Sequence, residues 1–230
     1  MRMAAAVDAT GRVAPAWGTD GPLSRAGPLP PLGSARGPVE VKPELRRHFR
    51  QQRRLAMAAA PGAIAAMAAG LVPPLLAPSQ RLGLYWPMGH EPDLRPLART
   101  LPAAWRHQLA LPAIRGSSML YLPWQMGDPL EPDGAGIPAP LGAEGLTPDQ
   151  LGLLLVPSLA VDVQGIRLGS GGGWYDRLRA DPLWRAVPAL AVVPALCVTA
   201  ALPRDPWDVP LSGWLDETGL HWASGRVATS

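Results

Sequence analysis

The sequence predicts an α/β fold built around a mostly parallel or mixed sheet, and three observations support this. Short apolar runs alternate with loops and helical segments through most of the chain, which is typical of layered α/β domains. The chain holds 29 prolines and 25 glycines. This argues against a helix bundle or coiled coil, because proline in a helix interior costs about 3 kcal/mol and glycine about 1 kcal/mol. A length of 230 residues with 47% hydrophobic side chains suits one domain with its own core.

The first expected element is a basic helix that begins near Lys42. Pro43 suits a first helical turn, and basic side chains recur along one face at spacings of 4, 4 and 3. Leu45 and Phe49 lie on the adjacent apolar face. A second, alanine-rich helix is expected over about 62–69. A glycine at 70 and two prolines at 73 and 74 follow this segment and end the helix.

Strands and short helices are expected to alternate through the rest of the chain. Strands are predicted at 81–86, 107–111, 119–123, 151–156 and 189–193, with a last extended segment at 209–215 and short helices at 93–99 and 174–180. The runs 151–156 and 189–193 are apolar throughout, which is typical of strands buried on both faces of a sheet.

Both ends of the chain are expected to lie outside the domain. Residues 1–39 are rich in proline and glycine without helical or strand periodicity, and we predict a disordered extension there. Residues 40–220 form the single domain and 221–230 a short flexible tail. No apolar run approaches the roughly 20 residues of a bilayer span, and the N-terminus lacks the apolar region of a signal peptide. We therefore expect a cytoplasmic monomer that has no membrane partner.

The cysteine and histidine content limits the possible metal chemistry. Cys197 is the only cysteine, which excludes an internal disulfide and a site built from several cysteines. The four histidines fall at no paired-ligand spacing, which argues against a histidine zinc site.

Positive charge is concentrated in the first helix. Residues 42–54 hold six basic side chains and one acidic one, while the rest of the chain holds 15 basic and 17 acidic residues. A charge run of this kind is usually a solvated helix face, and Arg47, Arg50, Arg53 and Arg54 are assigned to such a face. The alternative is a basic nucleic-acid-binding module that uses the helix from Lys42 to Arg54, although no regularly spaced aromatic platform accompanies it.

A glycine-rich segment at 165–177 predicts a phosphate site. Its glycines allow positive φ angles and a close approach of the backbone to a ligand, so that successive N–H groups can surround an anion, and the next helix begins at the same place. Arg167 and Arg177 could add bidentate contacts, and Asp176 offers an oxygen ligand for Mg²⁺. The segment matches neither a P-loop nor a dinucleotide fingerprint. A flexible surface loop is the alternative.

The run Gly-Ile-Arg-Leu-Gly-Ser-Gly-Gly-Gly-Trp-Tyr-Asp-Arg at 165–177 closely resembles the signature of the 5-formyltetrahydrofolate cyclo-ligase family. Weaker segments agree with that family in order and spacing, at 42–46, 85–93, 109–112, 124–130, 136–138, 155–157 and 207–210. The resemblance covers about 42–217 and leaves the proline-rich N-terminal residues outside.

This resemblance implies a three-layer α/β/α fold similar to that of sugar-phosphate isomerases and coenzyme A transferases. It also implies an ATP-dependent reaction with Mg²⁺, in which 5-formyltetrahydrofolate is converted to 5,10-methenyltetrahydrofolate. The formyl oxygen is phosphorylated, the nitrogen at position 10 closes the ring, and ADP and phosphate are released. Catalysis of this kind depends mostly on positioning and charge neutralisation. Folate and ATP are then the expected partners, and nucleic acid is not.

The resemblance also implies roles for individual residues. ATP contacts are implied for Lys42, Pro43, Glu44, Leu45, Arg46, Arg167, Leu168, Gly169, Ser170, Gly171, Gly172, Gly173, Trp174 and Tyr175. Folate contacts are implied for Trp86, Glu91, Ser170, Gly171, Gly172, Gly173 and Trp174. Asp176 and Asp208 match the Mg²⁺ carboxylates, and Arg167 and Tyr175 the catalytic positions. The chemistry is reasonable, because a carboxylate can accept two adjacent pterin N–H groups and an aromatic side chain can cover the flat ring.

Five positions depart from the family pattern, and they put details of substrate fit in doubt. They are Ala139, Trp174, Trp207, Ser212 and Asp216.

Overall fold

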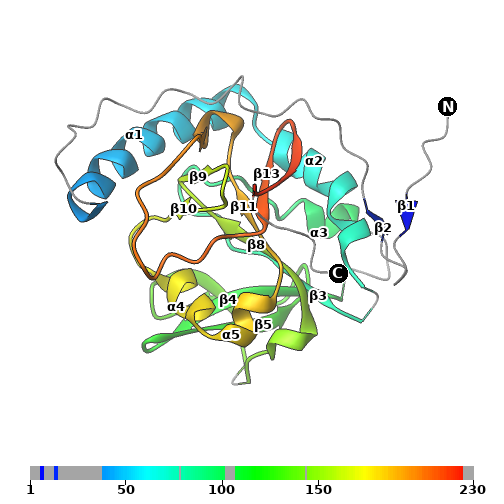
Figure 1. The fold of residues 1–230 in the computed structure, drawn as a ribbon. Helices are drawn as coiled ribbons and strands as arrows, with labels where there is room; N and C mark the ends of the chain where they lie inside the picture. Colours follow the sequence, from blue (N-terminus) through cyan, green and yellow to red (C-terminus); the bar gives the residue numbers. More distant parts are fainter. Residues whose placement is uncertain are drawn as a thin grey trace.

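The protein is described by a computed structural model, shown in Figure 1. The structure describes residues 6–7, 13–14, 38–77, 79–101, 107–142 and 144–224. Much of the predicted N-terminal extension and the last six residues of the predicted C-terminal tail lie outside the described residues.

A seven-stranded mixed sheet forms the centre of the molecule. Its strands are β3 (Arg81–Gly83), β4 (Leu109–Arg115), β5 (Ser118–Trp124), β8 (Leu151–Pro157), β11 (Ala189–Val192), β13 (Gly213–Asp216) and β14 (Gly219–Trp222). They are arranged in the order β14-β13-β11-β8-β3-β4-β5. The strands from β13 to β4 in this order run parallel to one another, and β14 and β5 add antiparallel edges.

Helices cover both faces of this sheet. On one face lie α1 (Pro38–Ala59), α4 (Trp174–Ala180) and α5 (Pro182–Ala186), and on the other lie α2 (Ala63–Leu71) and α3 (Leu97–Thr100). Figure 1 shows α2 on the opposite side of the molecule from α4 and α5. These layers confirm the predicted three-layer α/β/α class.

The apolar run of β8 explains why the sheet is covered on both sides. Leu154 and Val156 pack into the core cluster beneath α1, while Leu153 and Leu155 pack into the cluster beneath α2. Successive side chains of a strand point to opposite faces, so a strand that is apolar throughout needs a partner on each face.

Smaller elements decorate the three layers. A three-stranded sheet, in the order β10-β9-β12, contains β9 (Ala160–Asp162), β10 (Arg167–Leu168) and β12 (Val198–Thr199). Two antiparallel pairs are β6 (Leu130–Pro132) with β7 (Pro138–Pro140) and β1 (Ala6–Val7) with β2 (Val13–Ala14). Short 3-10 turns occur at Pro73–Leu75, Pro148–Gln150 and Ala195–Cys197.

Several helices and strands begin or end at other residues than predicted. The first helix begins at Pro38 and contains Pro43 in its interior, so the predicted boundary at residue 39 cuts the helix. The helix predicted at 93–99 begins only at Leu97, because Pro96 disfavours helical geometry at the preceding residue. At the C-terminal end, His221 and Trp222 belong to strand β14, since pairing with β13 extends the domain beyond residue 220.

Among the helices of the described residues, none is by itself long and apolar enough to cross a membrane. The segments Val41–Ala59 and Ala63–Leu71 meet the length and composition limits only when taken together, across a bend of 83°.

Candidate active site

A cavity of about 700 Å³ lies beyond the carboxyl ends of β3 and β8. Pro157 ends β8, and Trp86 follows β3 by three residues. Ligand sites of open α/β sheets occur at this edge. The charged side chains that line the cavity come from distant parts of the sequence and carry both signs: Lys42, Arg46, Arg53, Glu91, Asp133, Arg167, Asp176, Asp205 and Asp208.

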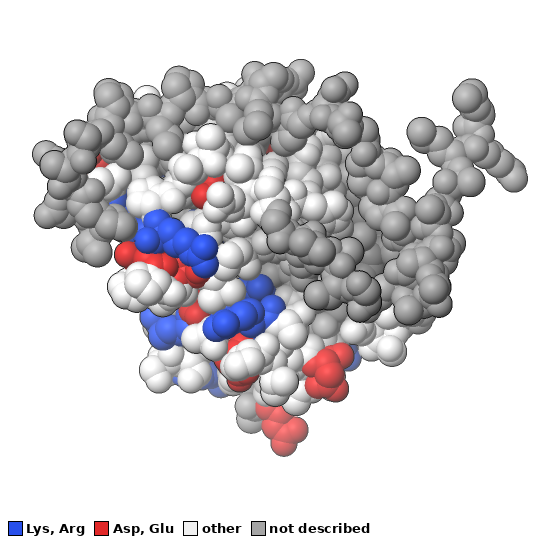
Figure 2. Space-filling view, in the orientation of Figure 1, with Lys and Arg blue, Asp and Glu red and all other residues white. Residues whose placement is uncertain are grey.

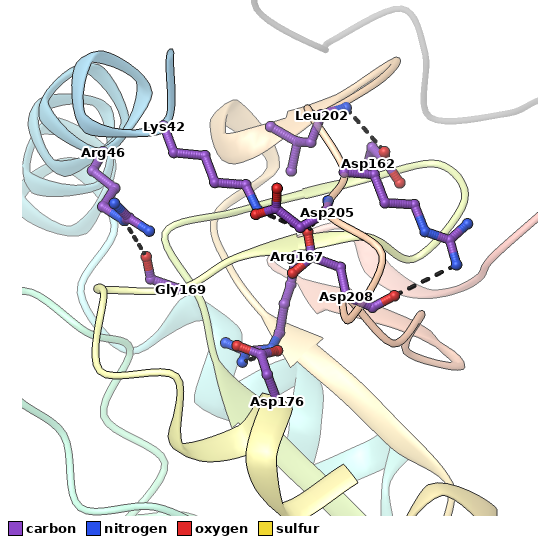
Figure 3. Close-up of polar contacts among 10 residues, drawn as sticks. Lys42, Arg46, Asp162, Arg167, Gly169, Asp176, Leu202, Asp205 and Asp208 are labelled. Atoms are coloured by element: carbon purple, nitrogen blue, oxygen red, sulfur yellow. Dashed lines mark hydrogen bonds and ion pairs between the residues drawn. The ribbon is translucent and has the colours of Figure 1, made fainter. Parts of the chain in front are cut away.

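Lys42 joins helix α1 to the loop before β13. Its Nζ donates to Asp205 Oδ2 at 2.5 Å and to Asp208 Oδ2 at 2.7 Å, as Figure 3 shows. The backbone N–H of Asp205 donates to the same Asp208 oxygen at 2.8 Å. Burial lowers the pKa of Lys42, but the two carboxylates raise it by more, so the net pKa lies above its ordinary value. The ammonium group therefore stays charged at neutral pH.

Asp162 ties this acidic loop to the turn that precedes the glycine-rich segment. Its Oδ1 accepts from the backbone N–H groups of Gln164 and Ile166, both at 2.9 Å, and its Oδ2 accepts from Leu202 N–H at 3.0 Å. Figure 3 shows Asp162 beside Leu202, on the same side of the site as Asp205. One buried carboxylate thus fixes two loops that both lead to the cavity.

Residues 169–173 form the glycine loop between β10 and α4. Arg46 Nε donates to the carbonyl of Gly169 at 3.1 Å, and Arg50 donates to the carbonyl of Ser170 at 3.3 Å. Gly171 has φ +118° and Gly173 has φ +65°. Residues other than glycine rarely adopt such positive φ angles. Gly173 caps α4 without a side-chain hydrogen bond. The two carbonyl contacts therefore attach the loop to α1 and leave its N–H groups to other partners.

Arg167 and Asp176 form an ion pair across the base of this loop. Arg167 donates to Asp176 Oδ1 at 2.7 Å, and its guanidinium lies 5.4 Å from the centroid of the Tyr175 ring. Burial raises the pKa of Tyr175 to about 12. The Tyr175 hydroxyl is therefore neutral at physiological pH, so it can donate a hydrogen bond but is not an anionic base.

Trp86, Glu91 and Arg53 form another group in the cavity wall. Glu91 Oε2 accepts from Met88 N–H at 3.0 Å, while its Oε1 lies 3.6 Å from Arg53. Burial raises the pKa of Glu91, an effect that the Met88 N–H and Arg53 offset only in part. The guanidinium of Arg95 lies 4.6 Å from the Trp86 ring centroid. A carboxylate and an indole thus both line this cavity.

The structure brings most of the predicted site residues together. Those that line the one cavity are Lys42, Arg46, Trp86, Glu91, Arg167, Leu168, Gly169, Ser170, Gly171, Gly172, Gly173, Trp174, Tyr175, Asp176 and Asp208. The side chains of Pro43, Glu44 and Leu45 are not part of this wall: Pro43 and Glu44 are exposed on α1, and Leu45 is fully buried in the core beside Phe49.

The sequence prediction missed two buried charged residues of the cavity wall, Arg53 and Asp205. Arg53 was assigned to a solvated face but is 7% exposed. The signal was present, because its spacing from Lys42 and Arg46 puts all three on one helical face. Asp205 stands three residues before Asp208 in a proline-flanked turn, and nothing local in the sequence distinguishes it from a surface acid.

The five departures from the family pattern fall in two groups. Trp174 and Trp207 line the cavity. Ala139, Ser212 and Asp216 are buried outside it, where Ser212 Oγ accepts from the backbone N–H of Ala189 and Asp216 accepts from Trp214 and Thr218. Differences in substrate contact are therefore expected only from the two tryptophans.

Comparison with known proteins identifies the family of this chain. The family model described as the 5-formyltetrahydrofolate cyclo-ligase family matches residues 38–215. The chain belongs to this family. It is 31% identical to the 5-formyltetrahydrofolate cyclo-ligase of Mycolicibacterium smegmatis over 135 residues, which is 56% of this chain and 69% of that protein.

Other relatives extend the comparison. The 5-formyltetrahydrofolate cyclo-ligase of Haemophilus influenzae is 32% identical over 95 residues, which is 40% of this chain; the match spans about half of that relative, 51% of its length. The solved 5,10-methenyltetrahydrofolate synthetase of Aquifex aeolicus aligns with a TM-score of 0.63 at 26% identity, covering 83% of this chain and 96% of that one. A synthetase structure from Mycoplasma pneumoniae, at 20% identity and a TM-score of 0.58 over 76% of this chain and 98% of that one, supports the fold.

The basic helix offers less exposed positive surface than its sequence suggests. Lys42, Arg46 and Arg53 face the cavity, and only Arg47, Arg50 and Arg54 of the six basic side chains are exposed. On the face shown in Figure 2, basic and acidic side chains lie beside each other rather than forming one positive surface. Membership of an enzyme family and this distribution favour a catalytic over a nucleic-acid-binding role.

Proposed function

We propose that this protein uses ATP to convert 5-formyltetrahydrofolate into 5,10-methenyltetrahydrofolate. One observation carries the proposal: a single cavity is lined both by a glycine loop and cationic side chains suited to phosphates and by a carboxylate and an indole suited to a pterin. The family and the names of its relatives point to the same reaction.

The nucleotide phosphates would lie at the glycine loop. The loop backbone can surround an anion. Arg46 contacts the loop from α1, and Lys42 of the same helix lines the same cavity. Arg167 lies at the base of the same loop. These cations would offset the charge on the triphosphate, which is the main requirement of phosphoryl transfer.

The carboxylates of the cavity fit a magnesium ion that arrives with the nucleotide. No group of three or more metal-binding side chains occurs within the part of the chain that the structure describes. However, Mg²⁺ is usually held by one or two carboxylates together with phosphate oxygens and waters, and Asp176 and Asp208 both line the cavity. Bound there, the ion would neutralise charge on the phosphate oxygens. In the structure, Lys42 holds the carboxylate of Asp208 and Arg167 holds that of Asp176.

The pterin would lie against Trp86 and Glu91. Glu91 can accept from two adjacent N–H groups of the ring, and Trp86 can cover its face. Because the glycine loop lines the same cavity, the formyl group would face the terminal phosphate.

The reaction then needs positioning rather than an enzyme nucleophile. The formyl oxygen attacks the γ-phosphorus, the bond between this phosphorus and the β–γ bridging oxygen breaks, and ADP leaves. The nitrogen at position 10 attacks the activated carbon and loses its proton. The carbon–oxygen bond breaks as phosphate departs with the original formyl oxygen. Arg167 would neutralise charge on the moving phosphoryl group, and Tyr175 would donate a hydrogen bond.

The cytoplasmic location and monomeric state remain predictions.

The proposal is tested by incubating the full chain with 5-formyltetrahydrofolate, Mg²⁺ and ATP. We expect the near-ultraviolet absorbance of the methenyl product to rise as ADP is released in equal amount, and neither to form when ATP or Mg²⁺ is left out. Failure to form product from the folded protein, together with tight and salt-sensitive RNA binding, would instead support the nucleic-acid alternative.

A further inference from the structure

Arg53 is a buried cation with unused hydrogen-bonding capacity. It comes from α1, is 7% exposed, and lines the cavity beside Glu91. One terminal nitrogen donates to the carbonyl of Ser158 at 3.3 Å and lies 3.6 Å from Glu91 Oε1. The Nε atom has no hydrogen-bond partner among the described residues. A guanidinium carries five N–H donors, so the described protein uses only part of this group.

The contact between Arg53 and Glu91 leaves room for a shared ligand. A separation of 3.6 Å exceeds the length of a hydrogen bond, and among the described residues no donor lies closer to Glu91 Oε1, since Met88 N–H donates to Oε2. A buried charge persists when partners compensate for its lost hydration. Arg53 and Glu91 therefore present a donor next to a pair of acceptor oxygens in the cavity wall.

The edge of a pterin has the complementary order of groups. Its 2-amino group and N3–H are donors, and the adjacent 4-oxo oxygen is an acceptor. We propose that Arg53 donates a hydrogen bond to the 4-oxo oxygen while Glu91 accepts from N3–H and the 2-amino group. This inference rests on the proposed function and adds a recognition residue to it. It makes α1 contact both substrates, with Lys42 and Arg46 at the phosphates and Arg53 at the ring.

A purely structural role for Arg53 makes a different prediction. If Arg53 only neutralises Glu91, its loss weakens every ligand that Glu91 binds. If Arg53 contacts the 4-oxo oxygen, its loss selectively weakens ligands that carry this oxygen. In the 4-amino-4-deoxy analogue of 5-formyltetrahydrofolate, the 4-oxo acceptor becomes an amino donor and N3 loses its hydrogen, while the 2-amino group can still donate to Glu91. An Arg53 that acts only through Glu91 therefore affects both ligands, whereas an Arg53 that contacts the 4-oxo oxygen affects only one.

The experiment measures the Kd of both ligands by calorimetry, without ATP, for the wild type, Arg53→Met, Arg53→Lys and the control Arg54→Met. Arg54 neighbours Arg53 on the same helix but is exposed. We expect Arg53→Met to weaken the 4-oxo ligand by about ten- to a hundredfold, the range for a hydrogen bond to a charged group. Its Kd for the 4-amino ligand should stay within about twofold of wild type, since no such bond is lost. Arg53→Lys should restore part of the 4-oxo affinity, and Arg54→Met should change neither Kd.

Equal weakening of both ligands by Arg53→Met would overturn this inference and leave the proposed function intact, as would no effect on either ligand. If Arg53→Met does not fold, as judged by circular dichroism, Arg53→Lys decides the question. It retains the charge beside Glu91 but lacks the fork of donors, so it should weaken the 4-oxo ligand alone, and equal weakening of both would overturn the inference. A wild-type protein that binds neither ligand would overturn the proposed function itself.

Discussion

Lys42 contacts two carboxylates that lie more than 160 residues away in the sequence, Asp205 and Asp208. Asp208 is also tied to Asp205 through the backbone N–H of the latter. Two neighbouring carboxylates repel each other unless a cation lies between them. Lys42 therefore offsets part of the negative charge of this pair before any ligand binds. A magnesium–nucleotide complex would have to share Asp208 with Lys42.

Asp176→Asn tests the proposed metal carboxylate. Asparagine keeps the shape but removes the charge, so we expect kcat to fall by on the order of a hundredfold or more, as when one electrostatic stabiliser is removed from a transition state. Steady-state kinetics with varied Mg²⁺ measures this. The control is Asp181→Asn, because Asp181 is exposed and caps α5 through Leu183 N–H, a role that asparagine also fills. Near-normal turnover of Asp176→Asn would refute the metal role.

Glu91→Gln tests the environment of the buried carboxylate through the pH dependence of stability. Burial raises the pKa of Glu91 in the folded state, so the folded wild type binds its proton more tightly than the unfolded chain. Its stability is then fully present below the unfolded pKa and falls as pH rises through the folded pKa. Glutamine does not titrate. We expect the free energy of unfolding of the variant, relative to wild type, to increase from about pH 4 towards neutrality.

Denaturant unfolding of both proteins across this pH range measures that difference. A constant difference would show that the pKa of Glu91 is not raised in the folded protein.

Individual residues show the limits of sequence reasoning. Glu91 and Trp86 could be found from the family resemblance, and both line the cavity. Leu45, which belongs to the same matched segment as Lys42, faces the core. Arg53 looked like part of a solvated charge run. Which side of a helix is buried depends on what packs against it, and for Arg53 that is the loop holding Ser158, 105 residues further on.

At the scale of elements, the glycine loop is fixed at several points. Arg46 and Arg50 hold its carbonyls from α1, and Asp162 anchors the turn before it. The backbone at Gly171 and Gly173 has positive φ angles, which other residues rarely adopt. The loop is therefore preorganised for a ligand rather than loosely tethered.

Gly171→Ala tests this geometry. The added methyl group makes only van der Waals contact, with Arg46 Nε at 3.9 Å, but φ is +118°, a conformation that costs about 1–3 kcal/mol for other residues. We expect KM for ATP to rise several-fold as the loop rearranges. The matched control is Gly70→Ala in α2, which has open space and no positive φ. It should raise the free energy of unfolding by about 0.5–1 kcal/mol without changing kinetics. Unchanged kinetics in Gly171→Ala would show that loop shape is unimportant.

The long apolar strands were predictable and the short ones were not. Strands β8 and β11 carry uninterrupted apolar runs, so sequence alone located them. Strands β9, β10 and β12 contain two or three residues each, too few to show a period. They exist because distant segments pair with them, as Val161 does with Val198. Local sequence does not encode such pairings.

At the scale of the whole molecule, the family match and the first helix begin at the same residue, Pro38. A protein that lacks residues 1–37 retains α1 and every residue of the cavity. We expect kcat and both KM values of this truncated protein to equal those of the full chain, as measured by the absorbance assay. A large loss of turnover would mean that these residues contribute to the site.

In the proposed function, one cavity transfers the γ-phosphoryl group of ATP to the formyl oxygen before ring closure. An isotope experiment tests this transfer: 5-formyltetrahydrofolate carrying ¹⁸O in the formyl group is supplied, and the products are analysed by mass spectrometry. We expect the released inorganic phosphate to carry the label, with one labelled phosphate for each methenyl product, and ADP to carry none. Unlabelled phosphate, with the label still present in the recovered substrate, would contradict it.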